Sequence, residues 1–156
     1  MNANRTQLAY QEAGVRNASA IELVITLYDI LARDLHGAVE AMETGNIEVR
    51  TAKLKHGFLA LQQLEGTLNM DEGRELARVM SGFYSMMRSQ MMKAQVGQDP
   101  GVLRELVELL FSVREAWVEV SNRLVASSEA VVAQSSSPDP KPSHDSEPVQ
   151  TTSWKA

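Results

Sequence analysis

Apolar residues recur at intervals of three or four along most of this chain, which is the spacing of one face of an α-helix. No run alternates apolar and polar residues long enough to indicate a strand. Four helices are predicted, with apolar stripes from Val24 to Met42, Leu54 to Leu68, Leu76 to Met91 and Leu103 to Leu124. Short connections between long helices favour antiparallel neighbours. The pattern therefore predicts an all-α fold, an antiparallel up-down-up-down four-helix bundle.

Polar residues mark the expected starts of these helices. Ser19 opens a capping box, in which its hydroxyl and a glutamate three residues later satisfy free backbone N–H groups. Asn46 is a favourable N-cap for the second helix, and Asp71 is the expected start of the third. Asp99 followed by Pro100 predicts the start of the fourth, because proline at the first helical position loses no hydrogen bond.

Composition divides the chain into three segments. Residues 1–18 are mostly polar and are predicted to be a flexible N-terminal arm. Residues 19–126 contain the helical stripes and form the predicted bundle. Residues 127–156 contain four of the five prolines, eight serines and few bulky apolar residues. Such a segment buries too little apolar surface to offset the entropy of ordering, so a disordered tail is predicted.

The overall composition narrows the classes of function. The 156 residues include no cysteine, which excludes disulfides and thiolate metal sites. A net charge of −5 argues against a nucleic-acid partner, which would select a basic face. No apolar run approaches the roughly 20 residues of a membrane span, and the N-terminus lacks the apolar core of a signal peptide. A cytoplasmic protein with no membrane insertion is expected.

A search for catalytic and metal-binding signatures finds none. Phosphate-binding loops, dinucleotide fingerprints, nucleophile elbows and HExxH are all missing from the sequence. The histidines His36, His56 and His144 lie far apart, and neither of the first two follows a glutamate at the spacing of di-iron bundles. Acidic residues on the predicted helices are expected on solvated faces: Asp34, Glu40, Glu43, Glu105, Glu108 and Glu119. We therefore expect no enzymatic activity, no metal and no cofactor.

The helices carry more apolar surface than one core stripe requires. Leu23, Leu27 and Ile30 lie beside the main stripe of the first helix, and four methionines crowd the third: Met86, Met87, Met91 and Met92. One interpretation is a wide core stripe. The other is an exposed groove for a helical partner, because flexible methionines adapt to such partners. The arm, with Leu8, Tyr10 and Val15, is a candidate to fold over that surface.

Several short motifs, in order and at matching spacing, resemble the FliS family of flagellar secretion chaperones. Ala9-Tyr10 and then residues 19–29 (SAIELVITLYD) resemble the family's AY and SPxxLIxMLYDG signature. Residues 68–73, residues 83–87, Asp99-Pro100 and the stretch ending at Trp117 resemble later family motifs, so the resemblance covers roughly residues 8–120. Departures include Ala20 in place of proline and Ile30 in place of glycine.

The resemblance implies a specific function. Members of the family are helical bundles that bind the disordered C-terminal segment of flagellin, prevent its premature polymerisation and help to deliver it to the flagellar type III export gate. It implies that Tyr10, Leu23, Leu27 and Tyr28 contact the partner, with a core position as the alternative for Tyr28. The surplus apolar surface adds further candidate contacts: Ile30, Met86, Met87 and Met91. A chaperone for another secreted helical protein, a structural homodimer and a metal-binding or catalytic bundle are the alternatives.

Overall fold

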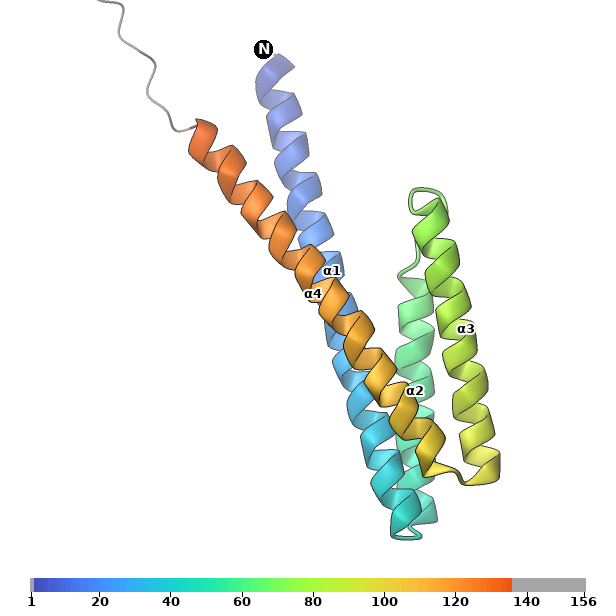
Figure 1. Ribbon diagram of the computed structural model, residues 1–156. Helices are drawn as coiled ribbons and strands as arrows, with labels where there is room; N and C mark the ends of the chain where they lie inside the picture. Colours follow the sequence, from blue (N-terminus) through green and yellow to red (C-terminus); the bar gives the residue numbers. More distant parts are fainter. Residues whose placement is uncertain (1, 136–156) are drawn as a thin grey trace, which may run out of the picture.

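Four long helices make up the computed structural model, which describes residues 2–135 (Figure 1). They are α1 (Asn2–Glu43), α2 (Ile47–Gly66), α3 (Arg74–Gly97) and α4 (Pro100–Ser135). Successive helices run in opposite directions, and this part of the chain contains no strand. The predicted all-α fold with four packed helices is confirmed.

The helices surround one apolar core in cyclic order. α1 packs extensively against α2 and α4, and α3 completes the ring through less extensive contacts with the same two helices. The largest fully buried side chains come from all four: Tyr28, Leu31, Leu35, Leu54, Leu61, Leu64, Tyr84, Met87, Met91, Leu103 and Leu110. Most of the predicted stripes of α1, α2 and the first half of α4 therefore face this core.

Short polar turns fix the register of neighbouring helices. Asn46 caps α2 as predicted, because its side-chain oxygen accepts a hydrogen bond from the Val49 backbone N–H at 3.1 Å. Asp99 Oδ1 accepts one from the Gly101 N–H at 2.9 Å, so the predicted start of α4 at Pro100 is also confirmed. Gln98 between α3 and α4 has a φ of 51°, the left-handed conformation that ends many helices.

Three predicted helix boundaries are wrong. α1 begins at Asn2 rather than Ser19, because residues 2–18 are mostly good helix formers without proline and continue the helix. These residues therefore do not form a loose arm, nor does that segment fold back over the bundle. α3 begins at Arg74 rather than Asp71, and α4 continues to Ser135, beyond the expected end at residue 126. The remaining tail, 136–156, lies outside the described residues.

The predicted stripe of α3 is partly wrong. Its core face consists of residues at strict three- and four-residue spacing: Ala77, Met80, Tyr84, Met87, Met91 and Ala94. Leu76 and Val79, which were expected in the core, are 56% and 59% exposed.

Burial divides the molecule into two parts. Among the described side chains, none of α1 before Val24 and none of α4 after Leu110 is buried. We call residues 5–23 of α1 and 111–134 of α4 the extension, and the four-helix remainder the closed half. Figure 1 shows α1 and α4 projecting together past α2 and α3, and diverging from the start of α3. Only two helices pack together in the extension, so each keeps an apolar face open.

Candidate functional site

The structure separates the eight predicted contact residues by exposure. Tyr10 and Leu23 are 79% and 51% exposed on α1. Ile30 and Met86 are partly buried against the core. The other four are buried in the core: Leu27, Tyr28, Met87 and Met91. Leu27, Met87 and Met91 match the wide core stripe, one of the two interpretations of the surplus apolar residues, and Tyr28 takes the core position that is its alternative.

Two buried tyrosines connect α1 to α3 across the diagonal of the bundle. The Tyr28 hydroxyl donates a hydrogen bond to the Tyr84 hydroxyl at 3.1 Å, and the ring centroids are 6.4 Å apart. Burial raises the pKa of Tyr28, although hydrogen bonds to Tyr84 and Trp117 lower it. Burial raises the pKa of Tyr84 as well, and its bond to Tyr28 adds to that effect. Both hydroxyls therefore stay neutral at physiological pH and hold this part of the core in one arrangement.

An apolar cleft opens between α3 and α4 above these tyrosines. Opposite edges of α3 face its two neighbours: Arg88 reaches Glu65 of α2, so the edge with Leu76, Val79, Phe83 and Met86 faces α4. On α4, Arg114 pairs with Asp29 of α1. The opposite edge, which faces α3, carries Leu109, Val113, Val120 and Leu124. We call the space between these two edges the α3–α4 cleft.

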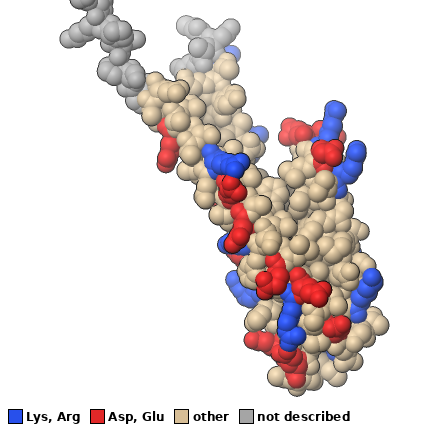
Figure 2. Space-filling view, viewed as in Figure 1, with Lys and Arg blue, Asp and Glu red and all other residues tan. Residues whose placement is uncertain are grey.

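The walls of the cleft are open to solvent although they are apolar. Leu76 and Val79 are more than half exposed, and Val120 is 41% exposed. Phe83 and Val113 lie deeper, packed against the core. Figure 2 shows the surface hollowed between the extension and α3, with few charged side chains there. Exposed apolar surface of this kind usually marks an interaction site. Of the predicted contacts, only Met86 lies on a wall of this cleft.

One acidic residue departs from the predicted solvated positions. Asp34 on α1 is 4% exposed and pairs with two side chains of α2, namely His56 Nδ1 and, at 3.6 Å, Lys53 Nζ. The expectation that Asp34 is solvated is wrong because α2 covers it and supplies its partners. The cluster links α1 to α2 within the closed half. Residues 2–135 contain no group of three acidic or histidine side chains arranged to hold a metal ion.

The site has the character of a binding surface. Its walls are apolar side chains that can cover the apolar groups of a partner. Its deepest polar groups are two neutral tyrosine hydroxyls. No helix within the described residues has the length and apolarity needed to cross a membrane. Fold and surface together define a helical bundle that acts by holding another polypeptide.

The comparison with protein families identifies the particular group. The family model described as "Flagellar protein FliS" matches residues 1–124, so this chain belongs to the FliS family. A flagellar secretion chaperone FliS from Bacillus subtilis is 29% identical over 70% of this chain and 80% of its own length. One from Campylobacter jejuni is 26% identical over 78% of this chain and 95% of its own length.

Family membership confirms two predictions made from the sequence motifs. The resemblance to FliS is confirmed, and so is the expectation of a non-enzymatic chaperone. A Salmonella typhimurium flagellar secretion chaperone FliS, 26% identical over 70% of this chain, agrees with this assignment. The family match ends at residue 124, so the last turns of α4 lie beyond it.

Proposed function

We propose that this chain is a cytoplasmic flagellar secretion chaperone that binds the disordered C-terminal segment of flagellin, with the α3–α4 cleft as its principal docking surface. The exposed apolar walls of that cleft, with Leu76 and Val79 on α3 and Val120 on α4, support the location. An amphipathic segment that folds into a helix on these walls buries its apolar face there. Flagellin held in this way is prevented from polymerising before export.

The cleft suits reversible binding. Removing exposed leucine and valine side chains from water contributes about 25 cal/mol per Å² of apolar area. A disordered segment that orders as it binds loses part of this gain to conformational entropy, so the complex can still release its cargo. The buried Tyr28–Tyr84 pair, held by a 3.1 Å hydrogen bond, forms a rigid base below the walls.

The predicted contact residues take different roles in this proposal. Met86 contacts flagellin at the cleft, whereas Tyr10 and Leu23 offer further exposed contacts along α1. A segment of about 40 residues, long enough for two or three helices, extends beyond one cleft and reaches such additional sites. The buried Leu27, Met87 and Met91 support the surface from within. Ile30, partly buried, belongs to the rim.

Calorimetric titration of the full chain with a peptide of the last 40 or so residues of the host flagellin tests the proposal. We expect one-to-one binding with a negative heat-capacity change and a gain in helicity. Val79→Asp, in the cleft, weakens binding at least tenfold. Val96→Asp is the matched control on the same helix, because Val96 is 85% exposed and lies outside the cleft. Absence of heat and helicity change with every host flagellin would overturn the proposal.

Delivery of the chaperone–flagellin complex to the export gate extends the proposal. Copurification of a tagged export-gate component with the preformed complex, and not with the free chaperone, is the expected result. The same samples distinguish two alternative functions that the sequence left open, a structural homodimer and a chaperone for another secreted protein. A homodimer would show a concentration-dependent molecular mass without peptide. A chaperone for another secreted helical protein would not bind the flagellin peptide.

A further inference from the structure

A second groove lies between α2 and α3, on the edge of α3 opposite the α3–α4 cleft. It has a volume of about 280 Å³ and is lined by Thr51, Lys55, Phe58, Leu59, Gln62, Arg88 and Gln95. Phe58 packs against the core and forms the base, and Leu59 is 50% exposed. The groove therefore has an apolar base between polar and cationic rims. Neither the family motifs nor the proposed cargo cleft accounts for these residues.

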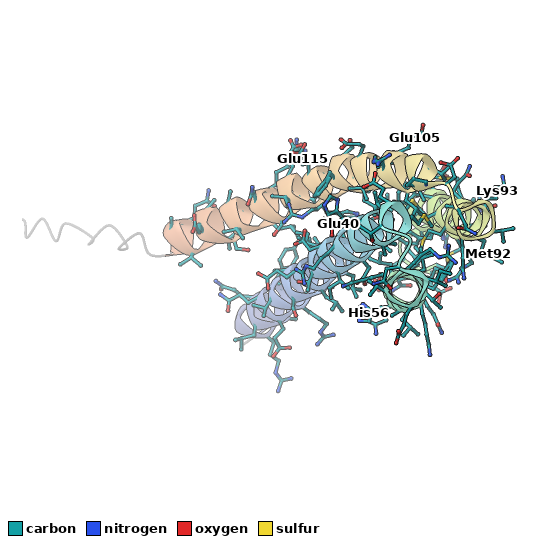
Figure 3. The ribbon with its side chains drawn as sticks, turned by 90° about the horizontal axis from the view of Figure 1, so that it is seen from below. Glu40, His56, Met92, Lys93, Glu105 and Glu115 are labelled. Carbon is teal, nitrogen blue, oxygen red and sulfur yellow. The ribbon has the colours of Figure 1, made fainter. Side chains whose placement is uncertain are left out.

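The two sides of the molecule differ in charge. α2 and α3 together carry seven lysines and arginines against three acidic residues. α1 and α4 carry six against eleven. In Figure 3, Glu105 and Glu115 point outward from α4, whereas Lys93 extends from α3 on another side of the bundle. Lysines and arginines thus occur on both helix pairs, but only the pair that forms this groove has more of them than acidic residues, in a protein that is acidic overall.

Among residues 2–135, one of the two cations at the groove is unpaired, and the other is shared with Glu65. Lys55 has no carboxylate partner within the described part of the chain. Arg88 contacts Glu65, with Nη2 to Oε2 at 2.7 Å, and both side chains are only partly buried. The amides of Gln62 and Gln95 add hydrogen-bond donors and acceptors on the two rims. An acidic side chain placed here meets an unpaired ammonium group and the partly exposed Arg88.

We propose that the α2–α3 groove is a second docking site, which takes an acidic amphipathic helix from a partner protein. The apolar side of that helix lies on Phe58 and Leu59, and its glutamates or aspartates face Lys55 and Arg88. Two antiparallel helices present parallel ridges between which a third helix packs. Complementary charge orients the partner and accelerates its association. The chaperone then holds cargo at the α3–α4 cleft while this groove binds the second protein.

The probe is a fluorescein-labelled peptide of about 18 residues, or five helical turns, with leucine every third or fourth position and glutamate on both flanks. A second peptide carries lysine in place of each glutamate. Fluorescence anisotropy is measured with the full chain. We expect saturable binding of the glutamate peptide, at least tenfold tighter than the lysine peptide, and weaker binding as salt rises. Equal binding of the two peptides overturns the proposal.

Single substitutions place the site. Leu59→Asp and Lys55→Glu should each weaken the binding of the glutamate peptide at least fivefold. Lys93→Glu, on α3 outside the groove, removes the same charge and should have less than a twofold effect. Both altered positions in the groove are exposed, so the variants are expected to keep the helical content of the parent. Unchanged binding to a correctly folded Leu59→Asp chain overturns the assignment.

A competition experiment separates this inference from the proposed cargo function. The inference rests on the proposed function only in naming the α3–α4 cleft as the cargo site. Excess flagellin C-terminal peptide should leave the bound glutamate peptide in place, and Leu59→Asp should leave flagellin binding unchanged. Displacement by flagellin would show that the groove belongs to the cargo site and would overturn a separate partner.

Discussion

The closed half and the extension use the same helices in different ways. In the closed half, α1 and α4 each pack against two neighbours, so side chains such as Leu31 and Leu103 are 0% exposed. In the extension the same two helices have only each other, and their contact leaves residues such as Val118 and Ser121 half-buried. Stability is therefore expected to reside in the closed half, whereas apolar surface for partners accumulates where helices lose their neighbours.

The largest expected difference is between the stability losses caused by truncating an apolar side chain in the closed half and in the extension. Leu35→Ala in the closed half removes a fully buried side chain and should lower the free energy of unfolding by about 3 kcal/mol. Val131→Ala, at a position 50% exposed in the extension, should change it by less than about 0.5 kcal/mol. Urea unfolding followed by circular dichroism measures both. Equal losses would mean that the extension is part of the cooperative core.

Removing the partners of the buried acid should have the next largest effect. His56→Leu with Lys53→Met leaves Asp34 buried without a counter-charge, and the free energy of unfolding should fall by about 2–3 kcal/mol. Adding Asp34→Asn to this double variant should recover part of the lost free energy of unfolding. His36→Leu is the control, because its pair with Glu40 is about 69% exposed on both sides. Urea midpoints that match in all these variants would contradict the role of Asp34.

Alkaline pH should reveal the tyrosine pair near the boundary between the two parts. Burial raises the pKa of Tyr28 and Tyr84 above the ordinary value of 10.0. Below pH 10 both hydroxyls are protonated in the folded and unfolded chains. Above pH 10 the unfolded chain releases these protons first, so stability should fall as pH rises. Urea unfolding at pH 8 and pH 11 measures this loss, and Tyr84→Phe should reduce it. An unchanged pH slope in Tyr84→Phe would argue against this pair as its source.

The smallest expected effect concerns the ion pair between α1 and α4. Arg114 Nη2 donates to Asp29 Oδ2 at 3.1 Å, and both side chains are about one-third exposed. Asp29→Asn should lower stability by about 0.5 kcal/mol, because solvent screens such pairs. The difference from the parent chain should shrink as salt is raised to 1 M. A loss comparable to that of Leu35→Ala would mean that this contact holds the extension to the closed half.

The candidate site was only partly predictable from the sequence. Tyr10, Leu23 and Met86 were named as contacts and lie exposed or on a cleft wall, whereas Leu27 and Met87 are buried. Leu76 and Val79, which form much of the cleft, lie within the stripe from Leu76 to Met91 that helical spacing predicts for the core. The choice between adjacent apolar stripes of α3 depends on which face meets the other helices, and helical spacing alone does not specify that.

Local chemistry in the sequence was sufficient for the four helices, their antiparallel order and the caps at Asn46 and Asp99, because these depend on neighbouring residues. The motifs of the FliS family could likewise be identified from the sequence alone. Only the tertiary structure decided that Asp34 is buried, that Tyr84 meets Tyr28 across the bundle and that α3 diverges from α4. Each of these depends on contacts between residues far apart in the chain, and their geometry follows from the packing of all four helices together.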